Sequence, residues 1–217
     1  MSLTNIGLVD HVKKALNEKW GYVYGTYGQF LTESLLQAKL KQYPDNVKQY
    51  ESYIRATFLG GKDGKQPKRV ADCVGLIKSF LWWKPDGPVY NSKTDLSANG
   101  MFQAAKTKGP IDTMPDMPGL GVRYNGHIGV YIGNGKVIES RGTKYGVVET
   151  DLKGRGWTHW LELPGIEYVK PVDELKEALE LICKESGIDY THWYAKAKEV
   201  KYLDVAFIKI AKVLRRN

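Results

Sequence analysis

Residues 72–83 read DCVGLIKSFLWW, and residues 126–139 read GHIGVYIGNGKVIE. The first stretch is apolar on most faces, which predicts a buried helix with Asp72 near its N-terminal cap. The second stretch holds two β-rich runs around a tight Gly-Asn-Gly turn, which predicts a β-hairpin. A buried helix and a hairpin in one chain indicate a domain that packs helices against antiparallel strands.

The rest of the chain points to the same class. Apolar residues repeat at helical spacing in several segments that Gly or Pro residues bound, and we expect these helices at 8–20, 32–43, 45–59 and 97–107. Two further short strands are expected at 146–150 and 158–169. The sequence therefore predicts an α+β fold.

Cys73 stands at the start of the predicted buried helix. Backbone N–H groups at a helix N-terminus favour a negative sulfur, so we expect a lowered pKa for this thiol. The same N–H groups can hold the oxyanion that forms when sulfur attacks a carbonyl. This placement favours a nucleophile over an ordinary core cysteine.

A thiol nucleophile needs an imidazole to carry its proton and a group that orients the ring. His127 opens a predicted strand directly after a glycine, where a ring can project into a cleft. Glu139 ends the partner strand, and the tight turn sets the two residues approximately opposite each other. Glu139 is therefore the expected orienting group, with Asn125 as the alternative.

The other histidines and the second cysteine have simpler interpretations. His11 and His192 are expected on helix surfaces, and His159 is expected to pack at the surface beside two tryptophans. Cys183 lies on the apolar stripe of a later predicted helix and is expected to be a buried core residue. No pair of Cys and His has the local spacing of metal ligands, so no metal site is predicted.

Three blocks of the sequence resemble the NlpC-type cell-wall cysteine peptidases, papain-like enzymes of bacteria and their phages. The family's D-C-S-G-[LF]-[VI] motif is similar to residues 72–77 (DCVGLI). Its P-G-D…G-H-V-G-I-Y-x-G-N-G block is similar to residues 118–119 (PG) followed by 126–135 (GHIGVYIGNG), and its upstream Y-x-[WY]-G-G motif to 22–25 (YVYG). The blocks follow the family's order and cover most of residues 20–160. The resemblance implies a papain-like domain, with helices packed on a small antiparallel sheet.

The resemblance also implies a role for each matching residue. Cys73 is the expected nucleophile and His127 the base, and Glu139 takes the orienting place, where many members carry His. Tyr22 is expected beside the oxyanion, and Asp72 near the free amine of the substrate. The family's chemistry needs no cofactor, so none is expected.

The sequence departs from the family pattern at positions that concern substrate recognition more than chemistry. Val74 replaces the usual Ser after the nucleophile, Thr26 replaces the second Gly of the upstream motif, and Leu120 stands where the family has Asp. A helical pair and a basic loop, about residues 30–66, form a helical insertion that a compact member does not need.

Two domains are expected, a catalytic domain over residues 1–168 and a small helical module over 169–217. Asp173 can cap the first helix of the module, and amphipathic segments follow near 191–199 and 203–214. The module is similar to short helical modules at the ends of phage lysins.

Composition narrows the class of partner. The 217 residues are 42% hydrophobic and 26% charged, which excludes general disorder and allows a real core. No apolar stretch is long enough to cross a bilayer, and the first residues lack a signal-peptide pattern. The formal net charge of +8 favours an anionic partner such as a cell wall. The basic residues are scattered and match no nucleic-acid-binding motif, so no nucleic acid is expected.

These observations predict a peptidoglycan hydrolase that cleaves an amide bond of the stem peptide by a Cys-His-Glu thiol mechanism. As a phage or prophage endolysin it is expected to be made in the cytoplasm, and to act on the bacterial wall after release or export. Two alternatives stay open: an amidase or endopeptidase of the CHAP type, and a non-catalytic wall-binding module of the same fold.

Overall fold

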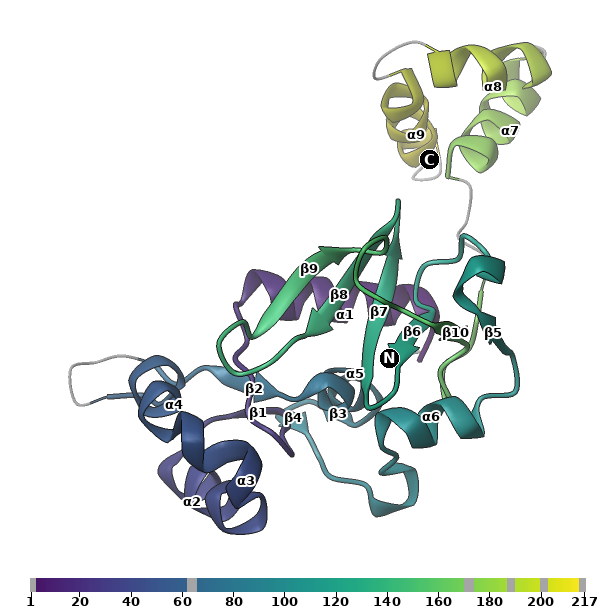
Figure 1. The fold of residues 1–217 in the computed structure, drawn as a ribbon. Coiled ribbons are helices and arrows are strands. Elements are labelled where there is room, and N and C mark those ends of the chain that lie inside the picture. The colour runs from purple at the N-terminus through teal and green to yellow at the C-terminus, as the bar shows by residue number, and fades with distance from the viewer. Residues whose placement is uncertain (1–2, 62–65, 170–173, 187–189, 200–202, 215–217) are drawn as a thin grey trace. The chain divides into compact units, whose positions relative to one another are not determined.

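The computed structural model describes the backbone of residues 3–61, 66–169, 174–186, 190–199 and 203–214 (Figure 1). Its contacts divide the chain into two units, residues 1–169 and 170–217. Helices and an antiparallel sheet make up the first unit, which confirms the mixed helix-and-sheet class. The papain-like assignment and the predicted domain roles stay predictions.

Six antiparallel strands form one sheet of the first unit, in the order β5-β10-β6-β7-β8-β9. Their bounds are Lys108–Pro110 (β5), Gly121–Tyr124 (β6), His127–Gly133 (β7), Lys136–Ser140 (β8), Val147–Asp151 (β9) and His159–Leu161 (β10). The predicted hairpin is β7–β8. The strand predicted at 158–169 is much shorter, because Pro164 lacks an N–H donor and Gly165 turns the chain with a φ of +85°.

Helix α1 (Asn5–Asn17) runs across one face of this sheet, and α5 (Cys73–Leu81) packs beside it (Figure 1). The side chains they bury with β7 and β8 form one apolar core, which includes Leu8, Val12, Leu76, Ile77, Ile128 and Ile138. Helix α1 starts and ends earlier than the predicted 8–20. The Thr4 side chain caps its first turn, and Lys19 adopts a φ of +54° that turns the chain away.

His11 on α1 is not the surface residue that the sequence predicted. Its ring lies among Trp20, Phe80 and Trp83, and one ring nitrogen lies 2.7 Å from the Ser79 hydroxyl oxygen. Burial, followed by the charge of nearby basic side chains, lowers the pKa of His11 to about 4. The ring is therefore a neutral part of the core at physiological pH.

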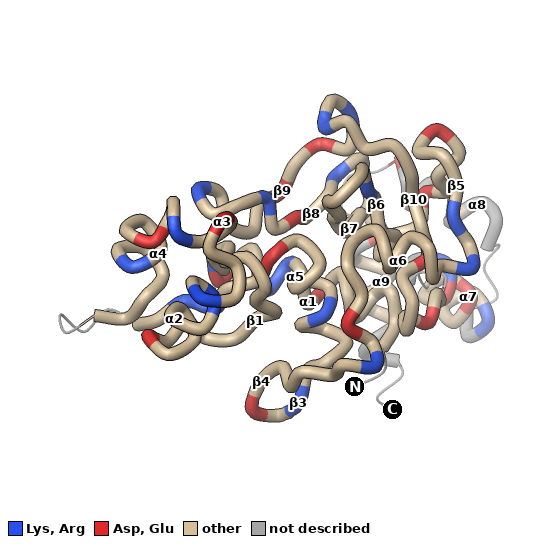
Figure 2. The backbone as a smooth tube through the Cα atoms, turned by 60° about the horizontal axis from the view of Figure 1, so that its bottom comes forward, with Lys and Arg blue, Asp and Glu red and all other residues tan. Residues whose placement is uncertain are grey.

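A helical segment, residues 33–58, stands at one end of the first unit and forms a small separate core together with Val23, Leu31 and Val70 (Figure 1). It consists of α2 (Glu33–Gln42), α3 (Pro44–Val47), a 3₁₀ turn η1 (Lys48–Tyr50) and α4 (Glu51–Phe58). Pro44 opens α3 rather than only separating two helices, since its fixed φ suits a first helical position. Strands β1 (Tyr27–Phe30) and β2 (Arg69–Ala71) precede and follow the segment in the sequence. They pair with each other and so anchor both ends of the segment. Basic and acidic residues both occur along it, as they do elsewhere in the chain (Figure 2).

Short elements connect α5 to the sheet. They are β3 (Trp83–Lys84), β4 (Gly87–Pro88), a 3₁₀ turn η2 (Ser92–Thr94), α6 (Ala98–Ala104) and a 3₁₀ turn η3 (Ile111–Thr113). The Ser97 side chain caps α6, which lies inside the range predicted for a helix.

The second unit contains helices α7 (Glu174–Ser186), α8 (Tyr190–Glu199) and α9 (Leu203–Leu214). Their shared core is built on Leu179 and Ala197, with rings of Trp193 and Phe207 packed against it. Cys183 is a half-buried free thiol on α7, and the predicted cap Asp173 lies outside the described residues. In the described part of both units, no helix has the length and apolar character that a membrane span requires.

Candidate active site

The N-terminus of α5 carries Cys73 as its first residue. Asp72 caps the helix, and its two carboxylate oxygens accept the backbone N–H groups of Gly75 at 2.7 Å and Gly25 at 2.8 Å. Position 75 needs glycine, because a Cβ there would lie 1.9 Å from the backbone oxygen of Thr26. The cap and this close approach together fix the position of Cys73 against the upstream loop.

The sulfur of Cys73 lies beside the start of β7. It is 4.0 Å from the carbonyl oxygen of Gly126, the residue before His127. Backbone N–H groups of Val74 and Ile128 also interact with the sulfur. Folding therefore brings the predicted nucleophile to the strand that carries the predicted base.

The thiol is less acidic than the sequence predicted. Burial raises the pKa of Cys73 to about 12, and the carboxylate of Asp72 adds to the rise. Backbone N–H groups at the helix start act in the opposite direction, but they do not overcome burial. The predicted lowering of this pKa by the helix N-terminus is therefore wrong. At neutral pH the thiol keeps its proton until a base removes it.

Strands β7 and β8 bring His127 and Glu139 within side-chain reach of each other, at diagonal rather than directly opposite positions of the two strands. Val130 pairs with Ile138, so Gly129 is the residue that faces Glu139. Position 129 has no side chain, and the imidazole of His127 reaches diagonally across the gap. Its Nε2 lies 2.6 Å from Oε2 of Glu139. Both side chains are largely buried, with 11% exposure for His127 and none for Glu139.

The carboxylate of Glu139 has three hydrogen-bonding partners. Arg155 donates from Nε and Nη2 to its two oxygens, each at 2.7 Å, and Thr150 donates its hydroxyl at 2.8 Å. Burial acts to raise the pKa of Glu139, but the hydrogen bonds from Arg155, His127 and Thr150 hold it at about 2. Glu139 is therefore a fixed anion at physiological pH.

An ionised Glu139 also fixes the state of the imidazole. Because a carboxylate accepts hydrogen bonds only, the Nε2 of His127 must carry a proton to donate to it. In the neutral ring the other nitrogen, Nδ1, is then an acceptor. Nδ1 is the atom of His127 that can take up a proton from a nucleophile.

Aromatic rings pack around His127. Tyr124 stacks at a centroid distance of 5.0 Å and Trp157 at 5.7 Å. Trp157 is itself covered by the guanidinium of Arg155 at 5.6 Å. These contacts limit the rotation of the imidazole and keep water from one side of it.

Arg155 is the functional candidate that sequence reasoning missed. It stands between two glycines in the loop after β9, and a charged residue in such a loop is ordinarily solvated. The pairing of β9 with β8 brings this loop to Glu139. No local pattern in the sequence indicates such a contact.

Tyr22 and Asn125 occupy different surroundings. Burial, followed by the charges of Cys73 and Asp72, raises the pKa of Tyr22 far above its usual value, so its phenol stays protonated beside the thiol. Asn125 accepts a hydrogen bond from Asn99 at 2.8 Å, whereas Glu139 holds the imidazole. The geometry thus favours Glu139 over the alternative that the sequence left open.

His159 packs edge-on against Phe102, and among the described residues it has no contact with Cys73. The side chain of His192 lies outside the described part of the chain. Within the described ranges, no group of three or more His, Cys, Asp or Glu side chains is arranged to hold a metal ion.

No protein-family model matches the chain, and neither does any curated protein. Among solved structures it is similar to the P60 domain of an antigen from M. avium subspecies paratuberculosis, with 21% identity and a TM-score of 0.40 over 76% of this chain and 98% of that one. It is also similar to the peptidoglycan hydrolase RipB from Mycobacterium tuberculosis, with 18% identity and the same TM-score over 76% of this chain and 67% of that one.

Replacing Arg155 by Met is expected to lower kcat by about 10- to 100-fold, as loss of a partner behind an active group commonly does. Without the guanidinium, burial raises the pKa of Glu139 from about 2. The carboxylate then becomes protonated, and stops orienting His127, at a higher pH than in the wild type. The acid limb of the pH profile of kcat should therefore move to higher pH. Arg155→Lys should recover part of the loss, because it keeps the positive charge but not the paired N–H donors that bind both oxygens of Glu139.

Arg141→Met is the matched control for this series, because Arg141 is exposed and stacks on Tyr145 instead. Thermal melts separate an effect on folding from an effect on the base. An acid limb that stays in place in folded Arg155→Met would show that Arg155 does not act through Glu139.

Proposed function

We propose that this chain is a cysteine peptidase that hydrolyses an amide bond in the stem peptide of peptidoglycan, with Cys73 as nucleophile, His127 as base and Glu139 as orienting group. One observation carries the proposal: the buried 2.6 Å contact between His127 and Glu139, on the strand whose start lies beside the Cys73 sulfur. A nucleophile, a base and an anion that holds the base are the parts that thiol catalysis needs.

In the first half of the reaction, Nδ1 of His127 removes the proton of Cys73 while the sulfur attacks the amide carbonyl. Asp72 takes the N–H of Gly75, while the N–H groups of Cys73 and Val74 interact with the sulfur at the helix start. These two donors are therefore close to the carbonyl that the sulfur attacks and can stabilise its oxyanion. The protonated phenol of Tyr22 is a further donor for this oxyanion. His127 then gives its proton to the departing amine, the C–N bond breaks, and a thioester forms on Cys73.

In the second half, water attacks the thioester carbonyl. His127 accepts a proton from that water and returns it to the departing sulfur of Cys73. The products are a carboxylic acid, an amine and the regenerated thiol, so no oxidant, reductant or cofactor enters the balance. Glu139 stays ionised throughout and stabilises the imidazolium that forms in each half.

Two features support peptidoglycan as the substrate. The motif blocks around Cys73 and His127 resemble those of cell-wall peptidases, and the formal net charge of +8 suits an anionic wall. A role as a phage or prophage endolysin, with the second unit as a wall-targeting module, belongs to the same proposal. Asp72 facing the free amine of the substrate is a further part, although two backbone N–H groups already bind its carboxylate.

Digestion of purified peptidoglycan tests the reaction class. We expect soluble fragments whose masses and new amino termini locate one cleaved amide inside the stem peptide. The glycan strands should gain no new reducing ends. Release of whole stems from the glycan would point instead to an amidase.

A catalytically dead variant provides the control for digestion. Cys73→Ala should bind the same walls and release nothing. If folded wild-type protein binds walls and also releases nothing, the chain is a binding module and the proposed peptidase activity is wrong.

A further inference from the structure

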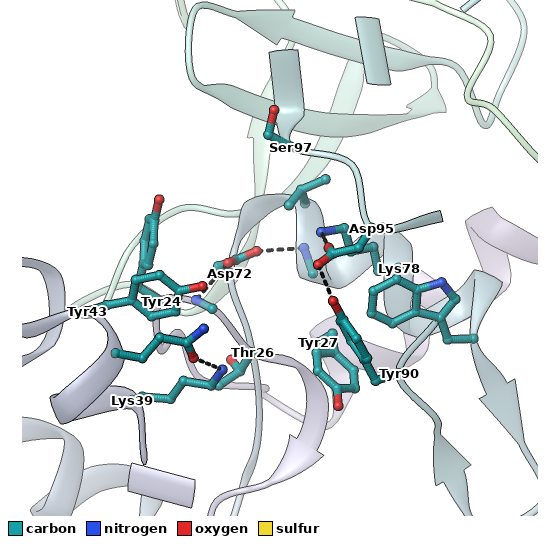
Figure 3. A pocket seen from close by; sticks show the side chains of 15 residues that line it. Tyr24, Thr26, Tyr27, Lys39, Tyr43, Asp72, Lys78, Tyr90, Asp95 and Ser97 are labelled. Atoms are coloured by element: carbon teal, nitrogen blue, oxygen red, sulfur yellow. Dashed lines mark hydrogen bonds and ion pairs between the residues drawn. The ribbon is translucent and has the colours of Figure 1, made fainter. Parts of the chain in front are cut away.

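A cavity of about 730 Å³ opens beside the N-terminus of α5 (Figure 3). Asp72 and Val74, the chain neighbours of the predicted nucleophile Cys73, are among its lining residues. Residues 24–26 and helix α2 line one side, and Tyr27 with the segment from Lys78 to Ser97 lines the other (Figure 3). The volume suits a short peptide or a small ligand.

Aromatic rings line much of this cavity. Tyr24 and Tyr43 meet edge-on at 5.0 Å on the side of α2. Trp82 makes similar contacts with Tyr27 at 5.1 Å and Tyr90 at 5.4 Å on the other side. The walls therefore offer apolar surface to the aliphatic part of a peptide.

Most charged groups in the cavity are already satisfied within the protein. Lys78 forms an ion pair with Asp95, which also accepts the Tyr90 hydroxyl at 2.8 Å. Both oxygens of Asp72 accept backbone N–H groups. These groups shape the cavity without needing a ligand.

Lys39 differs from the other charged groups. Its Nζ donates to the side-chain oxygen of Gln42 at 2.9 Å and lies 5.5 Å from the ring centre of Tyr43. Among the described residues, no carboxylate lies within ion-pair distance of it. Figure 3 shows the side chain extending from α2 toward Thr26, along the cavity wall.

The surroundings of Lys39 favour an anionic ligand. Burial lowers the pKa of the ammonium, although the charges of Asp72 and Asp95 act to raise it. An ammonium that has lost part of its water and has no paired carboxylate gains more from binding an anion than an exposed one does.

We infer that Lys39 binds a free carboxylate of the substrate, so that the enzyme prefers stem peptides with an acidic residue beside the cleaved amide over the same peptides with that acid amidated. The inference rests on the proposed peptidase function. It gives helix α2 a role in substrate selection, through a residue that none of the family-like motif blocks contains.

The test compares two synthetic stem peptides that differ only in a carboxylate or carboxamide at that residue. The wild type should cleave the carboxylate peptide with kcat/KM at least about tenfold higher, the size expected of a charge-assisted hydrogen bond. In Lys39→Met the ratio between the two peptides should fall to about one, mainly through KM. Lys39→Arg should retain most of the preference, since it keeps the positive charge.

Lys41→Met is the matched control, because Lys41 lies exposed on the same helix and does not line the cavity. It should leave the ratio at the wild-type value. Equal cleavage of the two peptides by the wild type, or an unchanged ratio in Lys39→Met, would overturn the inference and leave the proposed peptidase standing.

Peptide binding to Cys73→Ala separates failure of the inference from failure of the proposed function. Trp82 lines the cavity, so its fluorescence can report binding without turnover. If the wild type cleaves neither peptide, the peptidase proposal fails. The inference is still supported in that case if the Cys73→Ala protein binds the carboxylate peptide more tightly than the carboxamide peptide and if Lys39→Met abolishes this difference. Equal binding of both forms would reject the inference as well.

Discussion

Cys73→Ala should abolish amide hydrolysis, with a loss on the order of 10⁴-fold or more, because no other group at this position can form the thioester. Cys73→Ser should lose nearly as much. Burial already holds the proton on the more acidic thiol, and a hydroxyl in the same place is harder still to deprotonate. The measurement is release of soluble fragments from purified walls, with thermal melts to show that both variants fold.

Cys183→Ala is the control for this pair, because Cys183 is a half-buried thiol of the second unit. It should digest walls at the wild-type rate. A Cys73→Ala protein that releases fragments nearly as fast as the wild type would remove the basis of the thiol mechanism.

His127→Ala should lower turnover by about 10²- to 10⁴-fold, the range that general-base catalysis contributes. The expected loss is large because burial keeps the Cys73 thiol protonated at neutral pH, so its attack depends on a base that removes the proton. Turnover on a soluble stem peptide is the suitable assay, since it is independent of wall binding. His159→Ala is the control, because that ring packs on Phe102 instead.

Variants of Glu139 extend this prediction. Glu139→Gln would place an amide donor among the donors of Arg155 and Thr150, so it should misorient His127 even though its shape is similar. If His127→Ala and Glu139→Gln are both as active as the wild type and folded, a different base must serve Cys73.

Local signals explain what the sequence predicted correctly. A capping Asp72 before an apolar run marks the start of α5, and an Asn-Gly turn between β-rich runs marks the β7–β8 hairpin. Each signal depends on residues that are close in the chain. Both candidate catalytic residues, Cys73 and His127, stand at the ends of these elements.

Long-range contacts explain what the sequence could not predict. Arg155 reaches Glu139 only because β9 pairs with β8, and Lys39 reaches the cavity only because β1 and β2 anchor the helical segment beside α5. The raised pKa of Cys73 likewise follows from burial, which no local pattern reveals. A helix N-terminus predicts that its N–H groups lower the pKa of a thiol there, but it does not predict the net pKa.

The pH dependence of Cys73 alkylation tests most directly whether His127 activates the thiol. The experiment follows the rate of reaction with iodoacetamide from about pH 5 to about pH 10 in a Cys183→Ala background. In that background the thiol should react at neutral pH, since His127 can accept its proton. Adding His127→Ala should slow the reaction near neutral pH by on the order of 10²-fold or more and shift the profile to higher pH, because burial raises the pKa of the Cys73 thiol and no base is left to take its proton. Superimposable profiles with and without His127 would contradict the account.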